Sequence, residues 1–146
     1  MYGGKADWKK IAELKRNVDI PVFANGDVVS IETAVQCLEE SGADGVAIGR
    51  GALGDPSLLY RVEKYLNEGI YLPAPTLEEK IHILKKHLTE EVKFRGENIG
   101  IKFVRKFYPY YVNGFCGASK LRGELVLIDS LDEIFKKLDG ILALKL

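Results

Sequence analysis

Ile20-Pro21-Val22-Phe23-Ala24-Asn25-Gly26-Asp27 and Asp44-Gly45-Val46-Ala47-Ile48-Gly49-Arg50-Gly51 are the two stretches that decide the fold. Each contains a short, mainly apolar run, at residues 21–24 and 44–48, and each run is followed by a turn that contains glycine. Short apolar runs of this kind are typical of parallel strands that are buried on both faces. The sequence therefore predicts two strands of a parallel sheet.

Helices are predicted on both sides of these strands. Apolar residues recur at helical spacing over residues 6–17, from Ser30 to Gly42, and from Pro56 to about Asn67. Ser30 suits the N-cap of the second helix, and Gly42 is well placed to end it. The alternation of helix and strand predicts an α/β fold with a parallel sheet.

The segment 69–75 interrupts this alternation. It contains one glycine and two prolines, which are typical of loops and linkers. We therefore predict a first domain over residues 1–68, a linker over 69–75 and a second domain over 76–146.

The second domain is predicted to be all helical. Thr76-x-x-Glu79 and Ser130-x-x-Glu133 are capping-box motifs that each begin a helix. Four helices with short connections indicate an antiparallel four-helix bundle. They are expected over about 76–94, 98–112, 117–127 and from 130 onward, with Pro109 kinking or ending the second.

Length and composition limit the class of protein. The chain has 146 residues, whereas a complete (β/α)₈ barrel typically needs about 250. No apolar run approaches the ~20 residues of a transmembrane helix, and the N-terminus lacks the apolar core of a signal peptide. Cys37 and Cys116 have no zinc-binding spacing and are interpreted as reduced thiols of a cytoplasmic protein. His82 and His87 do not have the spacing of a helical metal site, so no metal is predicted.

The net charge of zero hides an asymmetry between the two halves. Residues 1–72 have 8 basic and 11 acidic side chains, a net charge of −3, and residues 73–146 have 13 and 10, a net charge of +3. Within the second half, residues 80–122 have 10 basic and 3 acidic side chains, a net charge of +7. Such a block indicates either an anionic partner or an ordinary solvated helix surface.

The ends of the two predicted strands are the places where a ligand is expected. Ligands of parallel α/β folds bind at the carboxyl ends of the strands, which here are the turns 25–27 and 49–51. Glycine lets backbone amides approach a phosphate closely, and Arg50 adds a charge-assisted donor. The alternative is that the glycines only permit tight turns between strand and helix.

Three segments of the sequence resemble the tRNA-dihydrouridine synthases. The family pattern is G-x-A-D-W, then I-P-V-x-x-N-G-D, then G-x-D-G-V-M-I-G-R-G-A-x-G-N-P-W, and it matches residues 5–8, 20–27 and 42–56. Ala47, Asp55 and Ser57 depart from it, replacing a bulkier residue, an Asn and a Trp. The basic helical half is also similar, so the resemblance covers essentially the whole chain.

This resemblance implies the C-terminal part of a flavoenzyme. The expected fold is strands 7 and 8 of an FMN-binding (β/α)₈ TIM barrel, followed by a four-helix domain that binds tRNA. The family reduces uridine to dihydrouridine in tRNA, with FMN as cofactor and NADPH as reductant. The residues that the resemblance assigns to the phosphate end of FMN are Asn25, Gly26, Asp27, Gly49 and Arg50.

The catalytic residue of the family is not found in this sequence. Its acid is a cysteine in an N-x-G-C-P motif, and Asn113-Gly114-Phe115-Cys116-Gly117 lacks the Gly-Cys-Pro. Cys116 is therefore interpreted as a structural or incidental thiol, and no catalytic residue is assigned. The chain is expected to be a fragment that is inactive alone. Its incomplete barrel is expected either to self-associate or to be disordered beside an intact helical domain.

The helical half supplies the candidate RNA contacts. Basic residues there can bind RNA phosphates without recognising base sequence. The interleaved aromatic residues, Phe103 and Phe107 among them, are expected to be bundle core rather than stacking platforms. The candidates for RNA contact are Arg105, Lys106, Lys120 and Arg122.

Two alternatives to a synthase fragment are kept. One is a module that binds tRNA without chemistry, which the +7 segment favours. The other is part of a different TIM-barrel enzyme that binds FMN or another phosphate, which the glycine turns permit.

Overall fold

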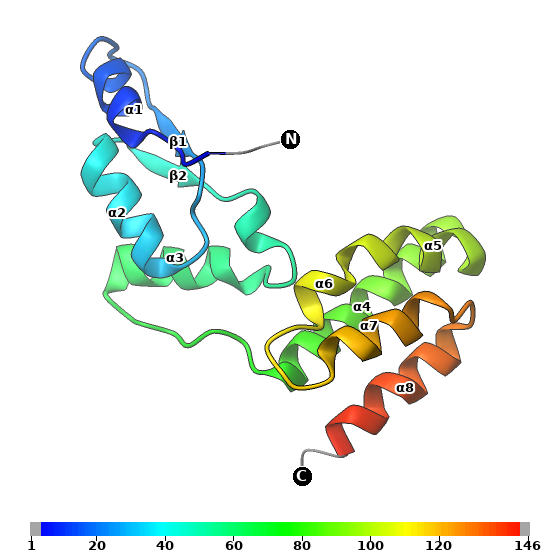
Figure 1. Ribbon diagram of the computed structural model, residues 1–146. Helices are drawn as coiled ribbons and strands as arrows, with labels where there is room; N and C mark the ends of the chain where they lie inside the picture. Colours follow the sequence, from blue (N-terminus) through cyan, green and yellow to red (C-terminus); the bar gives the residue numbers. More distant parts are fainter. Residues whose placement is uncertain (1–3, 144–146) are drawn as a thin grey trace. The chain divides into compact units, whose positions relative to one another are not determined.

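The computed structural model describes residues 4–143 (Figure 1). The chain divides into two compact units, Met1–Ala74 and Pro75–Leu146. The first unit combines helices with a small sheet, and the second is helical throughout its described residues.

The first unit alternates helix and strand. A two-stranded parallel sheet pairs Phe23 with Gly45 and Asn25 with Ala47. The predicted parallel pair is thus confirmed. In chain order the elements are α1 (Trp8–Lys15), β1 (Phe23–Asn25), α2 (Ile31–Ser41), β2 (Gly45–Ala47), a 3₁₀ turn η1 (Arg50–Ala52) and α3 (Ser57–Glu68).

Both strands are shorter than predicted. Strand β1 begins two residues after Pro21, which has no amide hydrogen to donate to a ladder. The next amide, that of Val22, donates to the Asp44 carboxylate at 2.6 Å instead of to a backbone carbonyl. The Asp44 amide in turn donates to the Val22 carbonyl at 2.9 Å, so Asp44 binds both polar backbone groups of Val22 just before the strands begin.

The expectation that the strands are buried on both faces is wrong for β1. Ala24 is fully buried, whereas Phe23 is 66% exposed and Asn25 is also exposed. Helices cover only one face of this strand within the described residues. That face carries the core of the unit, which consists of Ala24, Val28, Ile31, Ala34, Cys37, Leu58 and Val62.

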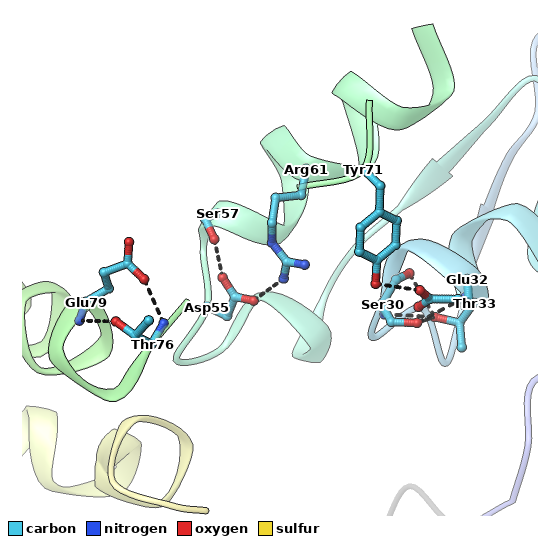
Figure 2. Close-up of polar contacts among 9 residues, drawn as sticks. All are labelled: Ser30, Glu32, Thr33, Asp55, Ser57, Arg61, Tyr71, Thr76 and Glu79. Carbon is cyan, nitrogen blue, oxygen red and sulfur yellow. Dashed lines mark hydrogen bonds and ion pairs between the residues drawn. The ribbon is translucent and has the colours of Figure 1, made fainter. Parts of the chain in front are cut away.

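The second unit is built from helices of unequal length. The capping box that begins α4 is formed: Thr76 Oγ1 accepts from the Glu79 amide at 3.2 Å, and the Thr76 amide donates to Glu79 Oε2 at 2.7 Å (Figure 2). The elements are α4 (Leu77–Arg95), α5 (Glu97–Val104), a 3₁₀ turn η2 (Arg105–Phe107), α6 (Tyr108–Tyr111), α7 (Ala118–Val126) and α8 (Leu131–Ala143).

The single helix predicted over 98–112 is wrong in detail. The chain forms α5, the turn η2 and α6 in its place. Pro109 has no amide hydrogen for the carbonyl of Arg105, and its ring crowds that carbonyl, so the α-helical pattern is lost where η2 begins. The proline therefore acts one turn before its own position.

The predicted aromatic core of this unit is confirmed for most of the residues. Tyr108 is fully buried and Tyr111 is 6% exposed, while the half-buried rings of Phe103 and Phe107 pack against the core. Tyr110 differs, since its side chain is 41% exposed. The other buried members are Ile81, Leu84, Leu88, Ile101, Val104, Val112, Ala118, Leu121, Leu125, Ile134 and Leu138.

Candidate functional site

The two glycine turns lie side by side in the first unit. The parallel register places the end of β1 beside the end of β2, because Asn25 pairs with Ala47. The loops that follow are in direct backbone contact: a Cβ added to Gly51 would lie 2.1 Å from the carbonyl oxygen of Val28. Glycine is therefore required at position 51 for this contact between the loops.

The turn 25–27 is held against the segment before α1. A Cβ at Gly26, whose φ is +131°, would lie 2.5 Å from the Cβ of Ala6. The indole Nε1 of Trp8 donates to the carbonyl of Gly26 at 3.0 Å. The Ala-Asp-Trp segment thus fixes the shape of the turn, and the two stretches belong to one structural unit.

Asp27 connects three parts of this site. Its backbone is left-handed, with a φ of +56°, which Asp tolerates better than most residues. Its Oδ2 accepts from the Ala6 amide at 2.6 Å, and its Oδ1 lies 3.8 Å from Nη2 of Arg50. The Arg50 side chain is 66% exposed, so it is held near the turn while it remains largely accessible to solvent.

A second ion pair stabilises the loop after β2. Arg61 on α3 donates to the carboxylate of Asp55, and the Ser57 hydroxyl donates to the other oxygen of the same carboxylate at 2.5 Å (Figure 2). The Arg61 side chain is only 9% exposed and that of Asp55 is 18% exposed. This pair was not predicted from the sequence, although an arginine beside Val62 on the apolar face of a helix is a recognisable signal.

The linker segment contacts the first unit as well. The Tyr71 hydroxyl donates to Glu32 at 2.8 Å (Figure 2). The Tyr71 ring also meets the ring of Tyr65 edge-on. Hydrogen bonds from Ser30, its own backbone and Tyr71 lower the pKa of Glu32, so the carboxylate is ionised at neutral pH. Residue 71 is thus fixed to α2.

In the helical unit, both predicted arginines make intramolecular contacts. Arg105 donates to the carbonyl of Ile128 at 3.2 Å and to the carboxylate of Asp129 at 2.6 Å. Arg122 donates to the carbonyl of Val112 at 2.8 Å. These contacts fix the loops before α7 and α8, and the role of the two arginines in RNA binding stays a prediction.

The two predicted lysines are more exposed than the arginines. Lys106 lies over the rings of Phe103 and Phe107, with its Nζ 3.9 Å and 4.9 Å from the two centroids. The Lys120 side chain is 83% exposed, and its Nζ is 4.0 Å from Glu124. Both remain candidates for RNA contact. Cys116 is exposed and Cys37 is buried in the first unit.

The sequence of this chain is similar to those of known proteins. The family model described as dihydrouridine synthase matches residues 1–145. The chain belongs to the dihydrouridine synthase family. It is 42% identical over 132 residues to a probable tRNA-dihydrouridine synthase 1 of Synechocystis sp., which covers 90% of this chain and 37% of that protein.

Other relatives in the dihydrouridine synthase family have similar identity to this chain and similar coverage. The tRNA-dihydrouridine synthase B of Pseudomonas aeruginosa is 39% identical over 90% of this chain and 40% of its own length. A probable tRNA-dihydrouridine synthase of Mycobacterium leprae is 40% identical over 95% of the chain and 37% of its own length. The chain thus spans 37–40% of the length of these relatives. Among residues 4–143, no helix combines the length and apolar character needed to span a membrane.

Proposed function

We propose that this chain carries the flavin-phosphate site and the tRNA-binding helices of a tRNA-dihydrouridine synthase. The observation that carries the proposal is the position of turns 25–27 and 49–51 side by side at the ends of paired parallel strands, in a member of this family. The strands β1 and β2 would be strands 7 and 8 of a TIM barrel. A bound FMN that has been reduced by NADPH would supply the hydride that reduces a uridine of tRNA.

The residues at the strand ends suit a phosphate group. The Arg50 guanidinium is exposed and would pair with the anion. A Cβ at Gly49 would meet no atom within 4 Å, so this glycine leaves open space beside the turn. The backbone amides of the two turns would donate to phosphate oxygens, as in other glycine-bearing phosphate sites.

Asp27 would have a different task from the other four candidates. A carboxylate repels a phosphate, and this one is already held by the Ala6 amide and by Arg50. We propose that Asp27 orients Arg50 toward the ligand, while Asn25, Gly26 and Gly49 shape the turns around it.

Chemistry on the uridine would need residues beyond those of this sequence. The family's cysteine acid lies in a motif that these 146 residues do not contain, and Cys116 belongs to the helical unit. We therefore propose that the chain binds its ligands in the cytoplasm but does not reduce uridine by itself. Exposed Phe23 on β1 would also let copies of this chain associate.

An FMN titration tests the phosphate site. The purified chain is titrated with FMN while flavin fluorescence is followed, and saturable binding is expected. Because charged hydrogen bonds contribute about 1.5–3 kcal/mol, Arg50→Ala should raise the Kd by about tenfold or more. Arg16→Ala removes the same charge at the far end of α1 from Asp7, and it should leave the Kd unchanged.

Two results would contradict the proposal. Equal affinity of the Arg50→Ala variant and the wild type would remove Arg50 from the site. Riboflavin, which has the same ring system without the phosphate, should bind at least as weakly to the wild type as FMN does to Arg50→Ala. If riboflavin bound as tightly as FMN, the turns would not be a phosphate site.

A further inference from the structure

A groove with a volume of about 400 Å³ is lined by residues of helices α7 and α8 of the helical unit. It is separate from the strand-end turns, which belong to the other unit. Its walls come from one end of α7 and the C-terminal half of α8. The lining residues are Gly117, Lys120, Leu121, Glu124, Lys136, Lys137, Gly140 and Ile141.

The charge of this groove is positive. Three of its lining residues are lysines, and Glu124 is the one acidic residue among them. Lys137 Nζ pairs with Glu124 Oε2 at 2.6 Å, which links α8 to α7 across the groove. Lys120 is 83% exposed, with its Nζ 4.0 Å from the Glu124 carboxylate, and Lys136 is exposed and makes no ion pair within the described residues. Two ammonium groups are therefore available to a ligand in solution.

Gly140 is a second, independent feature of the groove. It lies in the interior of α8, where glycine is less favourable than alanine because it loses more backbone freedom on folding. Packing does not require it, since a Cβ at this position would meet no atom within 4 Å. Because Gly140 has no side chain, it leaves the groove open at this position, and it does not stabilise the helix.

The arginines of the same unit do not offer comparable charge. Arg105 and Arg122 donate to carbonyl and carboxylate oxygens of their own chain. The groove lysines differ because the ammonium is a compact charge on a flexible stem, which suits phosphates without fixed geometry. The positive charge that is both exposed and gathered around a hollow is thus found on α7 and α8.

We infer that the α7–α8 groove is where the helical unit binds the phosphodiester backbone of RNA, through Lys120 and Lys136 with Gly140 leaving room for the strand. This inference rests on the proposed function, since it names the surface on which tRNA would lie. Binding of this kind depends on counterion release and is therefore sensitive to salt.

A charge comparison tests the inference. Binding of an unmodified tRNA transcript to the full chain is measured from 50 to 300 mM salt, for the wild type and for a Lys120→Ala/Lys136→Ala variant. Counterion release at 150 mM predicts a loss of about fivefold per lysine, and the slope of log K against log salt should fall by about one for each. The control is Lys86→Ala/Lys102→Ala, which removes two exposed lysines of α4 and α5.

A steric comparison tests the groove itself without changing charge. Gly140→Leu should fill the hollow and weaken tRNA binding at least fivefold, while raising the thermal midpoint of the helical unit. Gly123→Leu is the matched control: this glycine also lies inside a helix with no atom within 4 Å of an added Cβ, and it does not line the groove. It should stabilise the unit and leave binding unchanged.

The outcomes distinguish loss of RNA binding by the whole chain from loss of the groove as the binding surface. Wild-type chain that binds no tRNA at 50 mM salt would overturn the proposed RNA function and this inference with it. Wild-type binding that both lysine pairs weaken equally, or that Gly140→Leu does not change, would overturn the groove alone and leave binding to the general basic surface.

Discussion

Removal of the Arg61 guanidinium should lower the free energy of unfolding of the first unit by more than a surface mutation does. In an Arg61→Met variant the aliphatic stem still packs in the core, but the carboxylate of Asp55 loses its charged partner. Exposed ion pairs contribute about 0–1 kcal/mol, and loss of one partner of a fully buried pair costs about 3–5 kcal/mol. At 9% and 18% exposure this pair is nearer the buried limit. We expect the free energy of unfolding to fall by about 3 kcal/mol.

Trp8 provides the assay. It is the only tryptophan of the chain, and its indole donates to the carbonyl of Gly26 within the first unit. A urea titration followed by Trp8 fluorescence therefore reports on this unit, and the helical signal in circular dichroism is dominated by the longer helices of the other. The Trp8 transition should move to lower urea, and the helical transition should move little.

A double-mutant cycle measures whether Asp55 and Arg61 are coupled as a buried ion pair. Asp55→Asn retains an acceptor for Ser57 and Arg61 and should cost about 1 kcal/mol, because a charged hydrogen bond becomes a neutral one. In the Asp55→Asn/Arg61→Met variant the second change should cost at least 1 kcal/mol less than it does alone. Additive effects, or a loss below 1 kcal/mol for Arg61→Met, would show that the pair behaves as a surface pair.

Two further predictions concern other parts of the chain. Burial lowers the pKa of His87, whose Nδ1 lies 3.2 Å from the Tyr111 hydroxyl, so the unfolded chain binds a proton more readily. The stability of the helical unit should therefore fall as the pH drops below about 6.5, the pKa of an unfolded histidine. A His87→Gln variant should lose this dependence between pH 7.5 and 5.5 in urea titrations. Exposed Phe23 on β1 should promote self-association, so sedimentation velocity at rising concentration should show larger species that a Phe23→Ser variant lacks. Identical sedimentation of the two chains would exclude β1 as the contact.

Local chemistry explains why much of the fold could be predicted from the sequence. The capping box of Thr76 and Glu79 and the Ser30 cap depend on residues three apart, and both form as predicted. The exact limits of the two strands were not predicted, because they depend on how the strands pair. The exposure of Phe23 agrees with the expectation that an incomplete barrel leaves apolar strand residues without partners. The position of the break near Pro109 could have been inferred, since the carbonyl that loses its donor is always four residues earlier.

The candidate site also has some features that the sequence predicts and others that it does not. The pattern of turns 25–27 and 49–51 indicates adjacent strand ends because parallel strands bring these ends together. The contact of Gly51 with Val28 and the tie between Asp27 and Ala6 are not visible in any spacing, since the partners are 23 and 21 residues apart. Long-range pairing decides which charged side chains remain available, and sequence alone does not reveal that pairing.

The net charge of +7 over residues 80–122 does not show which of these basic side chains are available to a partner. Three of the ten cations are arginines, and each contacts its own chain: Arg95 the carboxylate of Glu91, and Arg105 and Arg122 the loops before α8 and α7. A planar guanidinium with several donors binds carbonyl and carboxylate oxygens in fixed geometry, so it serves as an internal connection. Under the proposed function, the charge available to RNA would then be mainly that of lysines. Two of those at the α7–α8 groove, Lys136 and Lys137, lie outside the block that first suggested an anionic partner.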